Sequence, residues 1–281
     1  HMLEAESPDM VSICTYVGLH YEMLVAAANA GVKAVLCEKP FMASLAQLQS
    51  IRDLVATTGI KIGVAHVRRY RPVFTHAQQL IQKGQIGTPI ACLAGIAGWD
   101  LSEWGSHWID MFRYLLSEQP VAWVMGQARV RDLRGFGHAM EDHATVHIGF
   151  ASGARGILDG GQAMPGDDIM TVVGSRGTIA IHNEEQMTLT NHAGTRTYDF
   201  QQQVSWDGCW DLAIADMCNW MTTGIEPRIG FTHVVESAEV NLAAYVSAVY
   251  RDRIDFPISD VYPDVWPLEL YAQPTPPNPK R

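Results

Sequence analysis

An alternation of strand-like and helical segments over the first 85 residues constrains the fold more than any other feature of this sequence. The alternating segments follow one another at 11–15, 21–30, 32–37, 45–57, 60–66 and 73–82. The three helical patterns stop at Gly31, Gly59 and Gly84, and glycine commonly ends a helix. Alternation at this pitch is typical of a parallel sheet with right-handed crossover helices. We therefore expect an α/β unit at the N-terminal end.

The pattern changes after Gly87 to a series of consecutive strands. An apolar run at 89–97 and a helical pattern at 103–116 precede strand candidates at 121–133, 143–151, 154–159, 169–174, 177–182, 186–190 and 196–200. Helical patterns return at 207–222 and 233–249, and a proline-rich tail expected to be extended begins at Pro257. This order predicts an α+β unit with a large, mostly antiparallel sheet flanked by helices. We place the domain boundary between 3–88 and 89–281.

Composition excludes several classes of function. Among the 281 residues 47% are apolar and 18% charged, which is enough for a sizeable core. The formal net charge of −10 argues against a nucleic-acid partner. The sequence contains no run of about 18 apolar residues, the length that a membrane-spanning helix needs, so we expect no membrane span. The five cysteines form no Cys-x-x-Cys pair, which favours a reducing cytoplasm. His138, His143 and His147 lack a completing cysteine or carboxylate, so we expect no metal site.

Two loops follow the first two predicted strands, at the edge of a parallel sheet where ligands bind. The segment 15–20 follows the first strand, and Glu38-Lys39-Pro40 follows the second. Pro40 keeps Lys39 out of the helical conformation, at the tip of its strand. A lysine held there can donate a hydrogen bond to a substrate hydroxyl and ease its deprotonation. The alternative interpretation is that Glu38 and Lys39 form a solvated strand cap.

A second candidate group lies at the start of the predicted helix 103–116. Glu103, His107 and Asp110 are spaced to share one helical face, and a histidine oriented by carboxylates is suited to act as a general base. Alternatively, the helix is simply capped and its histidine belongs to the core. Trp104 and Trp108 flank His107 and could stack on a sugar ring or pack in the core.

An ordered set of motifs carries a resemblance to one enzyme family. Besides the segments above, the set comprises Thr15…His20, Arg69-Tyr70-x-Pro72, Gly84-x-Ile86-Gly87, Gly105-x-His107-x-x-Asp110, Val173–Thr178, Gly224-x-x-Pro227 and Asp255-Phe256-Pro257. In this order and spacing the chain resembles the glucose–fructose oxidoreductase / inositol dehydrogenase / rhizopine-catabolism (Gfo/Idh/MocA) family. The similarity runs from about residue 8 to about residue 257.

The resemblance implies an oxidoreductase that transfers a hydride between NAD or NADP and a sugar, polyol or related carbonyl. It implies that His107 takes the hydroxyl proton, that Lys39 stabilises the oxygen, and that Asp110 and Glu103 complete the catalytic group. By the same resemblance the cofactor-binding residues are Thr15, His20, Glu38, Lys39 and Pro40. Arg69 and Trp104 are the implied substrate-binding residues.

Three departures from the family pattern shape the expectation. Glu103 stands where the family commonly has aspartate, and Thr15-Tyr16 replaces its Thr-Pro. No Gly-x-Gly-x-x-Gly turn follows any predicted strand, because the first strand here aligns with the family's fourth and on the order of 70 residues are missing. We therefore expect a truncated Rossmann-like half that binds the cofactor weakly.

Three explanations of the short N-terminal half lead to different functions. A start assigned too late or a shortened chain leaves the family's dehydrogenase function in place. A naturally short chain favours a redox-neutral lyase or epimerase acting on a sugar derivative. A subunit that covers the open sheet edge would make this chain a scaffold for an intact homologue. An exposed first strand also invites pairing with a second copy, so we expect a homo-oligomer, a dimer or a tetramer.

Overall fold

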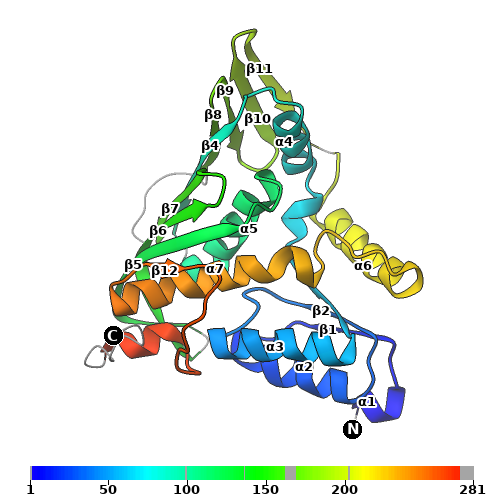
Figure 1. Cartoon of the computed structure of the whole chain (residues 1–281). Helices are drawn as coiled ribbons and strands as arrows, with labels where there is room; N and C mark the ends of the chain where they lie inside the picture. The colour runs from blue at the N-terminus through cyan, green and yellow to red at the C-terminus, as the bar shows by residue number, and fades with distance from the viewer. Residues whose placement is uncertain (1, 99, 136, 162–168, 202, 273–281) are drawn as a thin grey trace.

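The computed structural model describes residues 2–98, 100–135, 137–161, 169–201 and 203–272 and contains two β-sheets (Figure 1). The smaller sheet is parallel, with the strand order β1 (Met10–Ile13), β2 (Ala34–Cys37) and β3 (Lys61–Val64). Short helix α1 (Met2–Glu6) precedes it, and α2 (His20–Asn29), α3 (Leu45–Thr58) and α4 (Pro72–Gln82) follow its strands. The predicted α/β unit is confirmed.

Local sequence signals set the ends of these helices, as α3 illustrates. The Ser44 side chain accepts a hydrogen bond from the backbone N–H of Gln47 at the start of α3. At its end Gly59 adopts a φ of 70°, which favours glycine, and its N–H binds the carbonyl of Val55. Leu48 and Ile51 point into the core between these caps.

The larger sheet has the strand order β11-β10-β9-β8-β4-β7-β6-β5-β12 among the described residues. All neighbouring strands are antiparallel except the pair β4–β7. The bounds are β4 (Pro89–Ala97), β5 (Val121–Gly135), β6 (His138–Phe150), β7 (Arg155–Gly161), β8 (Ile169–Gly174), β9 (Gly177–His182), β10 (Gln186–Asn191), β11 (Gly194–Asp199) and β12 (Ile254–Asp255). The predicted large, mostly antiparallel sheet is confirmed, and the domain boundary at 88/89 stays a prediction.

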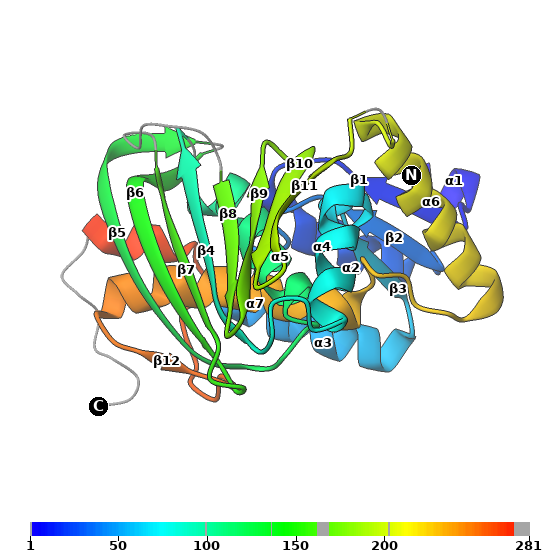
Figure 2. The same ribbon diagram turned by 90° about the horizontal axis from the view of Figure 1, so that it is seen from above.

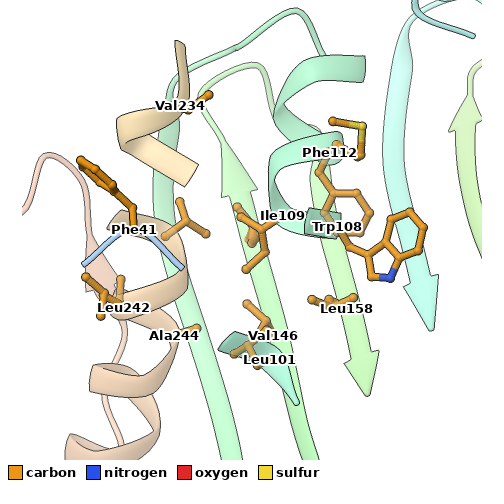
Figure 3. Packing of buried hydrophobic residues seen from close by; sticks show 14 of the residues in the cluster. Phe41, Leu101, Trp108, Ile109, Phe112, Val146, Leu158, Val234, Leu242 and Ala244 are labelled. Atoms are coloured by element: carbon orange, nitrogen blue, oxygen red, sulfur yellow. The ribbon is translucent and has the colours of Figure 1, made fainter. Parts of the chain in front are cut away.

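Two helices lie between the sheets and tie them into one core (Figure 2). In α5 (Ser106–Leu115) every residue is buried, and its Ile109 and Phe112 pack toward Val146 and Leu158 of the large sheet (Figure 3). Burying each such side chain contributes roughly 1.5–3 kcal/mol. Helix α7 (Phe231–Tyr250) packs on β5 on one side and on β3 and α3 on the other.

Helix α6 (Trp206–Thr223), drawn in yellow in Figure 1, covers the face of the small sheet that does not belong to the main core. Its Cys209, Ala213 and Met217 bury Ala34 and Leu36 of β2 in a second apolar cluster. The alternate residues of β2 belong to the main core, which is the pattern of a strand buried on both faces.

The structure corrects two details of the sequence-based expectation. The first turn of the helix expected at 103–116 is a π-helical turn, η3 (Leu101–Gly105), and α5 begins at Ser106. The tail was expected to be extended, but it forms a 3₁₀ helix, η4 (Pro267–Ala272), and buries Tyr262 and Trp266, because these aromatic side chains pack against the core around α7. Residues 273–281 of that tail lie outside the described residues. Among the described helices none is long and apolar enough to span a membrane.

Candidate active site

An ion pair joins the tip of β2 to the π-helical turn η3. The Nζ of Lys39 lies 2.8 Å from Oε2 of Glu103 and donates a second hydrogen bond, of 3.1 Å, to the carbonyl oxygen of Glu103. The Lys39-Pro40 peptide bond is cis. Among the described residues Lys39 Nζ has these two acceptors, so one of its three N–H groups is available to a substrate oxygen.

Buried carboxylates hold the turn that carries Glu103. Oδ1 of Asp100 accepts hydrogen bonds from the backbone N–H of Glu103 and the hydroxyl of Ser102. Oε1 of Glu141 accepts a 2.6 Å hydrogen bond from the backbone N–H of Leu101, together with one from the hydroxyl of Tyr245. Burial first, and the neighbouring Asp100 second, raise the pKa of Glu141 to about 7. The carbonyl oxygen that Lys39 contacts is therefore fixed by polar groups beneath it.

His107 lies on the first turn of α5 with only 8% of its surface exposed. Burial lowers its pKa well below the usual value, and the positive charges of Arg68, Lys39 and His66 lower it further. The imidazole is thus neutral near pH 7 and able to accept a proton. Its Nδ1 is buried without a hydrogen-bond partner among the described residues, which leaves Nε2 as the nitrogen that can meet a substrate.

Two residues beyond β3 complete the surroundings of His107. The His66 ring lies edge-on to that of His107, with 5.9 Å between ring centroids, and burial lowers the pKa of His66 to about 4. The guanidinium of Arg68 lies 5.0 Å above the Trp104 ring and pairs with Glu184 of the β9–β10 turn. Sequence reasoning did not single out His66. Its position directly after a third parallel strand, at the same edge as Lys39, was the available signal.

Asp110 and Arg69 form a buried ion pair. The Asp110 carboxylate, with no exposed surface, accepts two 2.8 Å hydrogen bonds from Arg69. All five N–H groups of Arg69 are engaged, the others by Glu118 and by the carbonyls of Arg228 and His233. Arg69 therefore has no donor left for a substrate. His107 and Asp110 both face His66 from α5, while Glu103 lies in the preceding π-helical turn and pairs with Lys39.

Comparison with known proteins identifies the family. Residues 1–66 match the model described as the oxidoreductase family NAD-binding Rossmann fold, and residues 94–180 match the model of the GFO/IDH/MocA C-terminal domain. The chain belongs to the Gfo/Idh/MocA family. Its sequence is 28% identical over 282 aligned positions to scyllo-inositol 2-dehydrogenase (NAD(+)) of Bacillus subtilis, covering 92% of this chain and 79% of that protein. It is 25% identical to D-apiose dehydrogenase of Paraburkholderia graminis, covering 88% and 72%.

Solved structures of similar proteins share the fold. A levoglucosan dehydrogenase in complex with NADH and levoglucosan superposes with a TM-score of 0.78 at 20% identity, covering 89% of this chain and 80% of that one. An oxidoreductase domain protein from Kribbella flavida gives 0.79, also at 20% identity, with coverages of 91% and 82%. The combination of a small parallel sheet and a large, mostly antiparallel sheet is therefore shared with these Rossmann-containing oxidoreductases.

In the loop after β1, the side chains of Thr15 and His20 form hydrogen bonds to other atoms of this chain. The ring nitrogens of His20, which has no exposed surface, lie 3.1 Å from the carbonyl oxygen of Phe41 and 2.9 Å from that of Thr15. The hydroxyl of Thr15 donates to the sulfur of Met23. His20 therefore joins two loops. Both of its ring nitrogens are engaged within the chain, and the expectation that His20 and Thr15 bind the cofactor stays a prediction. Glu38 is partly buried, and burial is the main reason its pKa is raised.

The residues present suit one end of a nicotinamide dinucleotide. Lys39 follows β2, and His107 of α5 faces His66, which follows β3, so the reactive ring of a cofactor and a substrate oxygen would meet at this edge of the parallel sheet. The described loop after β1 has a single glycine, Gly18, and a Cβ added there would meet the Tyr16 ring and the His138 imidazole. The described loops after β1, β2 and β3 thus contain no Gly-x-Gly-x-x-Gly cradle for the pyrophosphate.

Two histidines of the large sheet contact neighbouring side chains. His143 pairs with Asp159 at 3.0 Å, and His147 lies edge-on to the Trp123 ring. Within the part of the chain that the structure describes, no group of three or more histidine, cysteine, aspartate or glutamate residues could hold a metal ion.

Proposed function

We propose that this chain is a Gfo/Idh/MocA dehydrogenase that oxidises a secondary hydroxyl of a sugar or polyol with NAD or NADP. The observation that carries the proposal is that Lys39, with one N–H available, follows β2 and lies close enough for its charge to act on the neutral, buried His107 of α5. A bound nicotinamide supplies the hydride acceptor. Family membership and the named dehydrogenases among its relatives support this reaction class.

The two side chains divide the proton chemistry between them. In the oxidising direction Nε2 of His107 takes the proton of the substrate hydroxyl, while the carbon that bears this hydroxyl loses a hydride. The Nζ of Lys39 donates a hydrogen bond to the same oxygen and stabilises the negative charge that develops there. Glu103 keeps Lys39 in place through two acceptor atoms and needs no contact with the substrate. Trp104 lies beside His107, with Arg68 over its ring, and we propose that it forms a wall of the substrate site.

Assembly and compartment belong to the same proposal. Among the described residues β1 pairs with β2 alone, and an open strand edge favours pairing with a second copy, so we propose a homo-oligomer. All five cysteines are free thiols in the structure, and three are buried, which fits a reducing cytoplasm.

Cofactor titration followed by turnover assays tests the proposed function. Isothermal titration with NAD⁺ and NADP⁺ is expected to show binding of at least one of them. Absorbance of the reduced nicotinamide is then followed with inositols, aldoses and levoglucosan as substrates. Lys39→Ala and His107→Ala are expected to lower turnover by about 10²- to 10⁴-fold. Lys33→Ala, which removes an exposed lysine paired with Asp9, is the control. Failure to bind either cofactor, together with no turnover, contradicts the proposal.

A further inference from the structure

Two buried histidines face each other behind the proposed base, and neither has a full set of hydrogen bonds. His66 is 3% exposed and His107 is 8% exposed, and their rings meet edge-on at 86° with 5.9 Å between centroids. The Nδ1 atom of each is buried without a hydrogen-bond partner among the described residues. Leaving such a buried nitrogen unpaired destabilises the folded state, so two of them side by side call for a functional explanation.

The groups around His66 distinguish its two nitrogens. Its Nδ1 lies 3.8 Å from Oδ2 of Asp110, and the hydroxyl of Ser237 donates to Oδ1 of the same carboxylate. A cavity of about 10 Å³ opens beside the ring, with Ser106, Ser237 and Asn241 among its polar lining residues. That volume and polarity suit one water molecule. An anion and a water site on the Nδ1 side favour a proton on Nδ1 of His66 and leave its Nε2 as an acceptor.

Charged groups reach the two rings from every neighbouring element except α7. Lys39 comes from the tip of β2, Arg68 and Arg69 from η2 (Val67–Tyr70), and Asp110 from α5. The α7 residues that line the cavity are all uncharged, and its polar ones are Ser237 and Asn241. The surplus of positive charge disfavours a proton on either ring at rest. It therefore matters which nitrogen of the neutral His107 carries its single hydrogen.

We propose that His66 is a positioning residue for proton transfer at His107: it accepts a hydrogen bond from Nδ1–H of His107 and so keeps the Nε2 lone pair free for the substrate proton. This inference rests on the proposed dehydrogenase function. The tautomer of a histidine is set by the hydrogen bond that its other nitrogen makes, and hydrogen bonds of catalytic groups commonly tighten when substrate binds. When Nε2 accepts the substrate proton, His107 becomes an imidazolium. In this proposal the Nδ1–H of the imidazolium donates to Nε2 of His66, whose own Nδ1 lies 3.8 Å from the Asp110 carboxylate.

The tautomer of His107 tests the proposal directly, without cofactor or substrate. Nitrogen-15 chemical shifts of labelled histidine side chains separate Nδ1–H from Nε2–H forms, and loss of a signal in His107→Gln assigns the ring. We expect the unmodified chain to hold His107 as Nδ1–H at pH 7.5. In His66→Phe, which keeps the ring volume but has no acceptor, His107 is expected to shift to Nε2–H or a mixture. In His66→Gln the side-chain carbonyl accepts in place of Nε2 and restores the Nδ1–H form.

The control and the kinetic readout separate positioning from mere packing. His76→Phe removes a histidine that packs on Tyr198 and Phe200 and is expected to leave the His107 tautomer unchanged. We expect His66→Phe to lower kcat/KM by about 10- to 100-fold through kcat, and His66→Gln to recover most of it. His66→Leu serves as the second acceptor-free variant if His66→Phe does not fold. Retention of Nδ1–H on His107 in a folded acceptor-free variant overturns the inference. A chain with no dehydrogenase activity and the expected tautomer shift instead contradicts only the proposed function.

Discussion

Lys39 and Glu103 are 64 residues apart in the chain, yet their side chains meet at 2.8 Å between Nζ and Oε2. The contact joins the loop after β2 of the small sheet to η3, the π-helical turn that follows β4 of the large sheet. Both side chains are only partly exposed, so their attraction is less screened than that of a surface pair. The position of the proposed catalytic lysine therefore depends on how the two sheets are packed together.

Glu103→Gln is expected to lower kcat by about 10-fold while leaving the fold intact. The amide keeps the length and one acceptor of the carboxylate but removes its charge, so Lys39 is held less firmly. Glu103→Asp keeps the charge on a side chain that is one methylene shorter. Its kcat is expected to lie between that of the unmodified chain and that of Glu103→Gln. Glu22→Gln, at an exposed position in the first turn of α2, is the control for loss of a negative charge. Equal activity of Glu103→Gln and Glu22→Gln refutes this role.

The pH dependence of the oxidation reaction follows from the neutral state of His107. Because burial lowers the pKa of His107, its basic form persists below the ordinary histidine range. The acidic limb of kcat/KM is therefore expected below pH 6.5, with activity lost as pH falls through the lowered pKa. The limb is measured in buffers of constant ionic strength, with circular dichroism at each pH to exclude unfolding. A limb that lies above pH 7 contradicts this assignment.

Asp110→Asn is expected to destabilise the fold by about 3–5 kcal/mol, because it removes the fully buried one of the two carboxylates that pair with the Arg69 guanidinium and leaves only Glu118. The free energy of unfolding in urea measures the loss. Asp211→Asn, at an exposed position on α6, is expected to change stability by less than about 0.5 kcal/mol. A small effect of Asp110→Asn would show that Arg69 is held by its other acceptors alone.

Asp110 also predicts how stability changes in acid. Burial acts to raise the pKa of this carboxyl, but the charge and hydrogen bonds of Arg69 and its neighbours outweigh it and lower the pKa to about 2. The stabilisation is present above the unfolded-state pKa near 4 and is lost as pH falls toward 2. In Asp110→Asn this part of the acid dependence is expected to vanish. Urea unfolding at pH 5, 4 and 3 measures it, and an unchanged slope contradicts the prediction.

The pKa of Glu141 is raised rather than lowered, so its effect on stability changes with pH in the opposite direction to that of Asp110. Its pKa of about 7 lies above that of an unfolded glutamate, so its contribution to stability is present at pH 4 and is lost as pH rises through 7. Glu141→Gln keeps acceptors for Leu101 N–H and the Tyr245 hydroxyl and is neutral at every pH. We expect the variant to gain stability relative to the unmodified chain as pH rises from 4.5 to 7, as measured by thermal unfolding across that range. A pH-independent difference would show that Glu141 is ionised throughout.

Gly126→Ala is expected to cost about 1–3 kcal/mol, because a Cβ at this position of β5 would meet the backbone carbonyl of Ala244 on α7. Gly95→Ala is the matched control within the same sheet, since the nearest atom to its added Cβ lies 4.0 Å away. Urea unfolding of the two variants compares them. Similar stabilities would show that α7 can shift away from the sheet.

The sequence by itself determined the order of the elements and the identity of the chemistry-bearing residues. The spacing of apolar residues and the glycine that follows predict the bounds of α3 to within about a residue, and the apolar run 32–37 predicts β2. Both signals are local properties of the chain. Lys39 and His107 could be named for the same reason, since each sits at a recognisable junction of strand or helix. The position of His66 after β3 carried the same signal, although nothing local marks it as a partner of His107.

Only the tertiary structure decided which side chains meet. Asp110 is three residues from His107, yet its carboxylate binds Arg69, because the fold buries that guanidinium, which comes from η2, directly against it. The π-turn before α5 likewise redirects Glu103 toward Lys39 rather than along the helix face. Such pairings depend on the free energy of burying charges between packed elements, which spacing along one helix does not contain.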